Sequence, residues 1–581
     1  MNAPVVERTD PHLLAAARGD APCDLAIDHA RILNVFTGAF VEGCVGVLAG
    51  RIASVGPRVD ARDRLDARGL TLIPGLLDAH MHVESTMLLP TEFARLASAR
   101  GTTGAVLDPH EIANVLGLHG VWALMDDARD APLHALWAAP SCVPASHLET
   151  SGSELGPSEI AHLLADDRVV ALAEMMNFPG VVRALPDVLA KVRLGLAHGI
   201  VDGHAPGLSH RPLQAYAAAG ISSDHEATTS EEAIEKISLG MRIFIREGSA
   251  ARNLEALLPA VTRDTVGRFC FCTDDRHPAD LLDEGHIDHV LRRAISLGLD
   301  PTWAIRMATI NVAEHYRLPD LGAIAPGRLA DLVLIDDLHA PRARLVLFQG
   351  RVSARDSEPV APPRAKPSMT RAGSVTLPPG FSRESLLVRV SREGARIRVI
   401  GLRPGQLVTD SLIEPARVEQ GLALSDPARD ILKIAVVERH AKRGTTGLGF
   451  VRGFGLRRGA IASTIGHDSH NLAIVGTNDD DMTLAARTLA DVGGGQCVVA
   501  EGAVLDVLAL PIAGLISPDQ APVVVHRQRS LLDASNSLGC TLHDPFMPLS
   551  FLSLVVIPSL KLSDRGLVDV DRFDFVPLIV D

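Results

Sequence analysis

The chain has 581 residues, of which 47% are hydrophobic, and it carries a formal net charge of −14 at pH 7. This acidic balance argues against a nucleic-acid partner, which would favour a basic face. Its 7 cysteines include no C-x-x-C pair, and no apolar stretch suits a signal peptide or a membrane span, so we expect a disulfide-free cytoplasmic protein without a membrane partner.

The first predicted elements are short strands. Residues 24–66 show the alternation and turns of β-strands. Residues 330–336 and 344–352, far later in the chain, have the same pattern. We therefore predict a small β-domain built from residues 1–69 and 321–356, with a large insert between its two parts.

The insert, residues 70–320, alternates predicted strands with predicted helices. Eight strand–helix units in ~250 residues match a (β/α)8 barrel, an α/β fold whose chemistry lies at the C-terminal ends of the strands. The predicted strands cover residues 72–82, 102–108, 133–139, 169–177, 200–205, 221–226, 242–248 and 268–275. The helices predicted between them include residues 90–99, 116–127, 186–198, 230–239 and 287–297.

The opening strand of the insert ends in two histidines, His80 and His82. Their i, i+2 spacing puts both imidazoles on one face of a strand, where they can bind one metal ion. Exposed strand-end histidines have the same spacing, so this pair alone decides nothing.

Later strands of the insert also end in polar residues, and their gathering at one end of a barrel indicates a shared site. These residues are Asp108, His110 and Glu111 after strand two, Glu174 on strand four, His204 and His225 on strands five and six, Arg246 and Glu247 on strand seven, and Asp274 on strand eight. Asp108 and Glu111 suit equally well the N-terminal capping of the helix that follows them.

A different composition begins after the second β-segment. Residues 357–379 are rich in proline and read as a linker. Residues 380–581 mix strands and helices and predict a separate α+β domain, in which residues 384–399 predict a hairpin. Its polar segment Gly466–Asn471 is either a surface turn or a contribution to the mouth of the barrel.

The set His80, His82, Glu174, His204, His225 and Asp274 resembles the ligand set of the amidohydrolase superfamily, which pairs a metal-bearing barrel with a β-sandwich made from both flanks. The runs Pro74–His82 and Pro326–Val333 are typical of that superfamily. Narrower motifs resemble the bacterial adenine deaminases, and the tail domain is characteristic of that family. These motifs are His82–Met87, Asp108–Val115, Pro140–Ala145, Glu174–Asn177, Arg246–Ser249 and Ile465–Asn471.

The resemblance implies a TIM-like barrel, a flanking β-sandwich and a C-terminal domain of adenine-deaminase type. It also implies a binuclear divalent metal centre of manganese or iron, although zinc suits the same nitrogen and oxygen ligands. One ion would be held by His80, His82 and Asp274 and the other by His204 and His225, with Glu174 between them.

The implied reaction is hydrolytic deamination of adenine to hypoxanthine and ammonia by a metal-activated hydroxide, a step of purine salvage. Asp274 would take the proton of the nucleophile and pass it to the leaving amine. Glu111 would protonate the purine at N1, with Asp108 and His110 orienting Glu111 or the substrate.

Contacts to the purine are less sharply indicated. Phe178, Met175 and Met176 either pack against the ring or belong to the core. The polar candidates for the ring nitrogens are Arg246, Glu247, Ser469 and His470.

Two other functions compete with adenine deamination. One is hydrolysis of a cyclic amide, as in a hydantoinase or dihydroorotase, which would use the same metals on a carbonyl carbon. The other is a non-catalytic relative kept for assembly, which we would expect to have lost metal ligands. For an adenine deaminase, the partner is the small molecule adenine. We also expect a homo-oligomer, a dimer.

Overall fold

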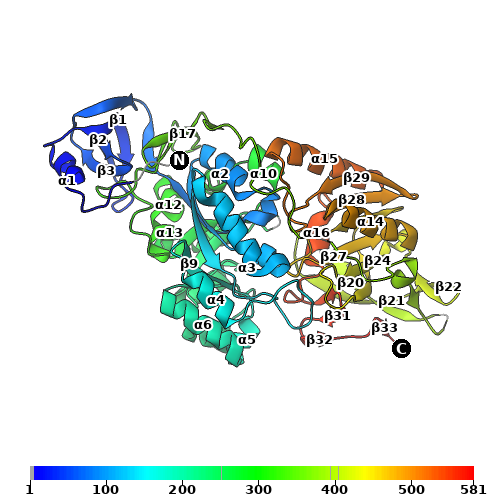
Figure 1. Ribbon diagram of the computed structural model, residues 1–581. Coiled ribbons are helices and arrows are strands. Elements are labelled where there is room, and N and C mark those ends of the chain that lie inside the picture. The colour runs from blue at the N-terminus through cyan, green and yellow to red at the C-terminus, as the bar shows by residue number, and fades with distance from the viewer. Residues whose placement is uncertain (1–4, 250, 374, 393, 404, 581) are drawn as a thin grey trace.

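The computed structural model describes residues 5–249, 251–373, 375–392, 394–403 and 405–580. The N-terminal strands lie at one end of the molecule, the parallel strands of the insert and their helices lie in the middle, and the C-terminal strands and helices lie at the other end (Figure 1).

One nine-stranded sheet joins strands from both flanks of the insert. Within it, β5 from the first flank pairs antiparallel with β15 from the second, and Val333 lies opposite Ile73. The predicted limits of the individual domains stay a prediction. The strands of this sheet are β1 (Cys23–Leu33), β2 (Phe40–Leu48), β3 (Arg51–Gly56), β4 (Ala61–Asp66), β5 (Thr71–Pro74), β15 (Leu332–Ile335), β16 (Ala343–Phe348), β17 (Arg351–Arg355) and β18 (Glu358–Pro359).

The predicted opening strand, residues 72–82, is divided between two sheets. β5 belongs to the flanking sheet, and β6 (Leu76–His82) begins the parallel strands of the insert. Gly75 lies at the crossing, where an added Cβ would come within 2.0 Å of Thr103 Oγ1. A side chain at this position would force the crossing apart, so glycine is required here.

The insert has the TIM-like α/β arrangement that its pattern predicts. Its strands are all parallel and form one run, β10-β9-β8-β7-β6-β14, and a second, β11-β12-β13. Because β13 continues into β14 after Thr273, the two runs share the last strand position. The strands are β6, β7 (Thr102–Leu107), β8 (His134–Ala139), β9 (Val169–Met175), β10 (Val201–Gly203), β11 (Ser223–Asp224), β12 (Arg242–Arg246), β13 (Phe269–Cys272) and β14 (Asp274–Asp275).

Helices cover the outside of these strands (Figure 1). The predicted helices at 90–99 and 186–198 are observed with those limits, and proline lies at the start of each. The helices include α2 (Pro90–Ala99), α3 (His110–Asp127), α4 (Pro157–Leu164), α5 (Phe178–Val182), α6 (Pro186–His198), α7 (His210–Ala218), α8 (Ser230–Ser238), α11 (Ile287–Ser296), α12 (Pro301–Met307) and α13 (Ile310–His315).

The C-terminal part is built on a second nine-stranded sheet. The predicted hairpin over residues 384–399 is wrong, because β19 (Val388–Arg389) pairs with β23 whereas β20 pairs with β21 and β25. The main elements here are β20 (Arg396–Leu402), β21 (Thr409–Pro415), β23 (Leu422–Leu424), β24 (Ile431–Val437), β25 (Thr446–Arg452), β26 (Ala460–Ser463), β27 (Leu472–Gly476), α14 (Asp479–Val492), β28 (Gly495–Ala500), β29 (Ala503–Ala509), α15 (Ala521–Ser537), α16 (Phe546–Phe551), β30 (Leu560–Ser563) and β31 (Gly566–Asp569).

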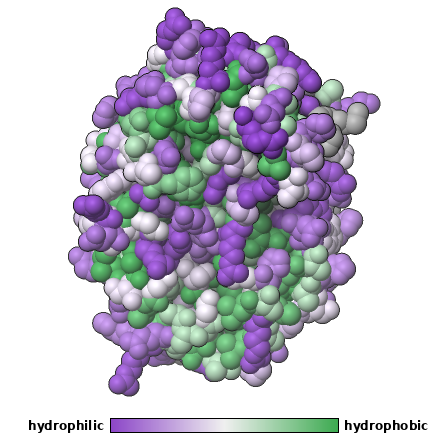
Figure 2. Space-filling model, turned by 90° about the vertical axis from the view of Figure 1, so that its left-hand side faces the viewer, coloured by the Kyte–Doolittle hydropathy of each residue, from purple (hydrophilic) through white to green (hydrophobic). Residues whose placement is uncertain are grey.

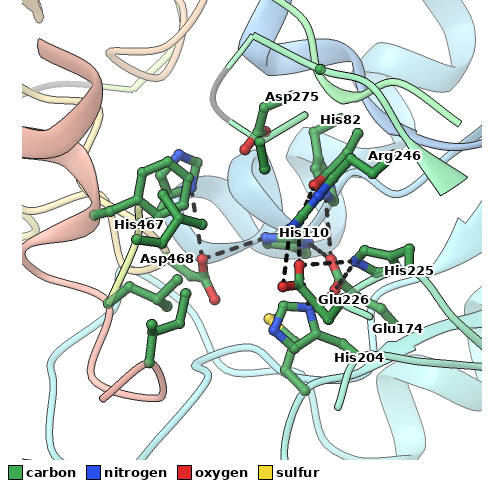
Figure 3. Close-up of a pocket in the computed structure, with 18 residues that line it drawn as sticks. His82, His110, Glu174, His204, His225, Glu226, Arg246, Asp275, His467 and Asp468 are labelled. Carbon is green, nitrogen blue, oxygen red and sulfur yellow. Dashed lines mark hydrogen bonds and ion pairs between the residues drawn. The ribbon is translucent and has the colours of Figure 1, made fainter. Parts of the chain in front are cut away.

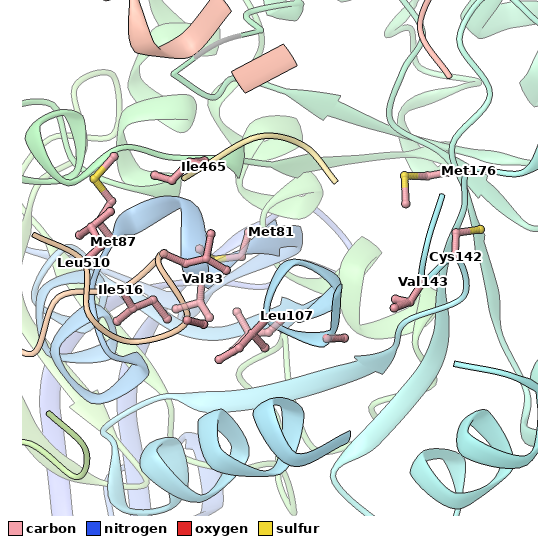
Figure 4. Close-up of a cluster of buried hydrophobic side chains, with 14 of the residues drawn as sticks. Met81, Val83, Met87, Leu107, Cys142, Val143, Met176, Ile465, Leu510 and Ile516 are labelled. Atoms are coloured by element: carbon pink, nitrogen blue, oxygen red, sulfur yellow. The ribbon is translucent and has the colours of Figure 1, made fainter. Parts of the chain in front are cut away.

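A single hydrophobic cluster crosses from the insert into the C-terminal part (Figure 4). Met81 and Leu107, at the ends of β6 and β7, share it with Ile465, Leu510 and Ile516 of the C-terminal part. Burial of this apolar surface stabilises the contact. The C-terminal part is thereby held over the carboxyl ends of the parallel strands.

None of the described helices is long and apolar enough to cross a membrane. Hydrophilic and hydrophobic residues are interspersed on the face shown in Figure 2. Each of the 7 cysteines is free and buried, as the absence of a disulfide framework predicts.

Candidate active site

The six predicted metal ligands meet at the carboxyl ends of the parallel strands. His80 and His82 end β6, Glu174 lies on β9, and Asp274 begins β14. Each of the six side chains belongs to a buried residue that is at most 6% exposed. The two remaining ligands are His204, directly after β10, and His225, directly after β11.

Glu174 lies between two pairs of histidines. Its Oε1 is 3.7 Å from His80 Nε2 and 3.3 Å from His82 Nε2. Its Oε2 is 2.6 Å from His204 Nδ1 and 3.3 Å from His225 Nε2. One carboxylate is therefore shared by both pairs, which is the arrangement expected of a bridging ligand.

Asp274 faces the first pair and an arginine. Its Oδ1 is 3.6 Å from His80 Nε2 and 3.1 Å from His82 Nε2, and its Oδ2 accepts a hydrogen bond of 2.7 Å from Arg246 Nη1. Burial opposes ionisation of Asp274, but Arg246 and the two histidines hold its pKa well below the usual range. Arg246 also pairs with Glu226, so the guanidinium is locked between two carboxylates.

The buried polar atoms fit a metal centre. Among the described residues, no hydrogen-bond partner exists for His80 Nε2, for Glu174 Oε2 or for either ring nitrogen of His204. The close contact between His204 Nδ1 and Glu174 Oε2 therefore lacks hydrogen-bond geometry. Unpaired polar atoms are costly in a protein interior, and nitrogen and oxygen donors that converge in this way suit a divalent cation.

One histidine is oriented by the backbone behind it. His82 Nδ1 lies 3.0 Å from the carbonyl oxygen of Asp108. A proton on Nδ1 that is donated to this carbonyl leaves Nε2 free to bind metal. The Asp108 main chain thus fixes the tautomer and ring orientation that a ligand needs.

His110 lies between two carboxylates beside the predicted metal ligands. Its Nδ1 is 3.1 Å from Asp108 Oδ2, and its Nε2 is 3.7 Å from Asp468 Oδ1. Burial would lower the pKa of His110, but Asp108 and Asp468 raise it well above the usual value. In Figure 3, Asp468 and His467 approach His110 from the C-terminal part of the chain.

A second group of carboxylates lies behind His467. Ser85 Oγ is 2.9 Å from Glu111 Oε1 and 2.5 Å from Asp275 Oδ1, so the hydroxyl connects the two acids. Burial raises the pKa of Glu111 well above the usual value, and the carboxylates of Glu84 and Asp275 raise it further. Glu111 is therefore a buried acid whose neutral form is favoured by its surroundings.

A cavity lies over the predicted ligands, and the C-terminal part closes it. Its polar wall includes His110, Glu226 and Asp275 from the insert. The C-terminal residues that line it are His467 and Asp468 together with apolar Leu407, Phe551, Leu554 and Ile557. The segment Gly466–Asn471 is buried, so its interpretation as a surface turn is wrong and it contributes to the mouth of the barrel.

Several predicted substrate contacts do not line this cavity. Phe178 begins α5 and lines a different pocket. Glu247 forms an ion pair of 2.7 Å with Arg293, on the other side of β12 from Arg246. Ser469 donates its hydroxyl proton to Glu149 Oε2 at 2.6 Å.

The remaining predicted contacts divide between the cavity and its surroundings. His470 is fully buried behind the cavity, and its Nε2 lies 3.9 Å from Glu111 Oε2. Arg246 and Met176 line the cavity, whereas Met175 lies in the hydrophobic core. Glu111 does not line the cavity. It is connected through Ser85 to Asp275, which lines the cavity.

Residues that the sequence-based prediction did not assign to the site fall into three groups, the first being His467 and Asp468 within the predicted polar segment Gly466–Asn471. Glu226 and Asp275 directly follow the predicted ligands His225 and Asp274, so the strand-end pattern could have found them. The four apolar lining residues of the C-terminal part come from two segments that are far from the barrel in sequence, and no local pattern marks them.

Two family models match this chain. The model of the amidohydrolase family matches residues 71–360, and the model of the adenine deaminase C-terminal domain matches residues 406–574. The adenine deaminase of Desulfatibacillum aliphaticivorans is 48% identical to this chain over 98% of this chain and 99% of the relative. That of Methanothrix thermoacetophila is 46% identical over 98% and 99%, and that of Cereibacter sphaeroides is 44% identical over 98% and 100%.

Proposed function

Because this chain belongs to the adenine deaminase family, we propose that it hydrolyses adenine to hypoxanthine and ammonia. The observation that carries the proposal is the buried Glu174, which faces two pairs of histidines beneath a cavity closed by the C-terminal part. The retained set of predicted metal ligands speaks against a non-catalytic relative.

We propose a binuclear centre in which His80, His82 and Asp274 hold one ion, His204 and His225 hold the other, and Glu174 is shared. A donor set of nitrogen and oxygen without thiolate suits manganese or ferrous iron, and zinc as well. When bound, two such ions acidify a water molecule and make it a nucleophile near neutral pH.

Asp274 is the residue to which we assign proton transfer at C6. Attack of water forms the C6–O bond, and loss of ammonia breaks the C6–N bond. Asp274 accepts one proton of the water and gives it to the departing amine, a general-base and then general-acid role. The second water proton leaves the C6 oxygen as the carbonyl forms and restores the acid that protonated N1. Arg246 holds the carboxylate at 2.7 Å and keeps it ionised for the first of these steps.

Protonation of the ring is assigned to the acids connected by Ser85. N1 must gain a proton as C6 becomes tetrahedral, and Asp275 lines the cavity where the ring would lie. Glu111 is the proton reserve, because Ser85 connects it to Asp275 by contacts of 2.9 Å and 2.5 Å. His110 orients the substrate from the neighbouring wall, and Asp108 holds the His110 ring through Nδ1 at 3.1 Å.

The deaminase and the cyclic-amide hydrolase differ in product. We expect manganese-loaded protein to release ammonia from adenine and to leave hydantoin and dihydrouracil intact, as measured by an ammonia assay and by chromatography. Adenosine and guanine, tested in parallel, define the tolerance of the site. Ring opening of a cyclic amide without ammonia release from adenine would overturn the assignment. The homodimer stays a prediction, which light scattering can test.

Glu247 provides a test of the corrected substrate contacts. We expect Glu247→Gln to lower the free energy of unfolding by about 1 kcal/mol, because Arg293 is partly exposed and water therefore screens the ion pair that is lost. KM for adenine should stay within about twofold of the wild type, since Glu247 does not line the cavity. A tenfold higher KM with unchanged stability would show that Glu247 contacts the substrate after all.

A further inference from the structure

Lys561 is a buried lysine without an acidic partner. It lies on β30 and is 0% exposed, and among the described residues no carboxylate forms an ion pair with it. Its Nζ donates hydrogen bonds to the carbonyl oxygens of Leu407 at 2.8 Å and Phe551 at 3.0 Å. Burial lowers the pKa of Lys561 to about 7. A lysine is almost never fully buried without a carboxylate partner, so Lys561 is a candidate for a role beyond packing.

Both acceptors belong to the apolar wall of the active-site cavity. Leu407 and Phe551 line the cavity, and so do Leu554 and Ile557 in the turns after Phe551. The ring of Phe551 stacks on His467, with centroids 4.5 Å apart and planes inclined by 21°. A shift of Phe551 would therefore also move a polar side chain that lines the cavity.

The two wall segments are distant in sequence, and Lys561 joins them next to the cavity. The segments are also linked further away, where Thr409 Oγ1 donates to the carbonyl of Leu560 at 2.8 Å and Thr409 N donates to the carbonyl of Pro558 at 3.0 Å. Leu407 also packs against the hydrophobic cluster that contains Phe551, a contact without fixed direction. One ammonium group thus ties the backbones of Leu407 and Phe551 together by directional hydrogen bonds. Small displacements of groups that position a substrate have large effects on catalysis.

We propose that Lys561 is a positioning residue that fixes the apolar wall against which the purine ring lies. The proposal rests on the proposed function and extends it to the recognition of the base. Lys561 does not touch the substrate. It acts through Leu407 and Phe551, so its loss should weaken binding more than it slows the chemistry.

The test compares Lys561→Met and Lys561→Gln with a matched variant, Lys433→Met. Methionine keeps the length of the side chain without any N–H, whereas glutamine retains an N–H pair for one carbonyl. Lys433 is also buried in the C-terminal part, where its Nζ pairs with Asp479 and donates to the carbonyl of Leu386, and it does not line the cavity. Its loss should lower the melting temperature and leave KM unchanged.

We expect Lys561→Met to raise KM for adenine ~10-fold or more, with a smaller change in kcat and an unchanged metal content. Lys561→Gln should lie between Lys561→Met and the wild type, and calorimetry with hypoxanthine should give the same order. A KM for Lys561→Met within twofold of the wild type, an equal rise in Lys433→Met, or loss of metal would overturn the proposal. If Lys561→Met does not fold, Lys561→Gln decides by the same criterion. A wild type that releases no ammonia would overturn the proposed function, and this inference with it.

Discussion

Replacement of Glu174 by glutamine is expected to abolish adenine turnover and to remove bound metal. The two carboxylate oxygens face different histidine pairs, at 3.3 Å from His82 Nε2 and 2.6 Å from His204 Nδ1. A carboxamide has the same volume but offers one oxygen and no charge, so it cannot serve both pairs. We expect kcat/KM to fall ~10³-fold or more. Elemental analysis should show fewer metal ions per chain.

Asp202→Asn is the matched control for loss of a buried carboxylate. Asp202 lies on β10, close to His204 in sequence, but its oxygens contact His315, Tyr316 and Ser223 instead of the ligand cluster. We expect this variant to lose stability and to keep its metal. A Glu174→Gln protein with full metal content and full turnover would remove Glu174 from the centre.

The ligand cluster could be predicted from the sequence because parallel strands carry their carboxyl ends to one rim. His80, His82, Glu174 and Asp274 lie in or directly after apolar runs of strand length, so their depth along the barrel axis can be predicted without coordinates. His204 and His225 follow shorter and partly polar segments, and the alternation of strands and helices along the chain places them at the same rim. The same reasoning explains the error at Glu247. Successive side chains of a strand point to opposite faces, so Arg246 at the end of β12 in the cavity favours the opposite direction for Glu247, which pairs with Arg293.

The wall of the cavity could not be predicted in this way. Leu407 and Phe551 are ordinary apolar residues, and their position depends on how the C-terminal sheet packs on the insert. The hairpin predicted over residues 384–399 failed for a related reason, since local alternation identifies strands but does not choose their partners. Contacts between distant segments are decided by tertiary packing, which a single sequence does not display.

Glu111→Gln is expected to slow adenine turnover ~10²-fold while the metal content stays at the wild-type value. Burial, together with Glu84 and Asp275, raises the pKa of Glu111 well above the usual value, which favours the protonated form that a proton donor needs. Glutamine has the same shape and still donates an N–H to its neighbours, but it cannot release a proton to Ser85. Steady-state kinetics and elemental analysis on the same preparation measure both quantities.

Glu84→Gln separates proton transfer from a simple effect of charge. Glu84 belongs to the same buried group, but its Oε1 accepts a hydrogen bond of 3.1 Å from the backbone N–H of Ile112, and burial raises its pKa to about 6. If the group acted only through its negative charge, both variants would slow the reaction equally. A relay through Ser85 requires Glu111→Gln to be slow and Glu84→Gln to remain within a few fold of the wild type. Full activity in Glu111→Gln would show that the proton for the purine does not come from Glu111. Asp275 or another residue of the cavity would then donate that proton without resupply through Ser85.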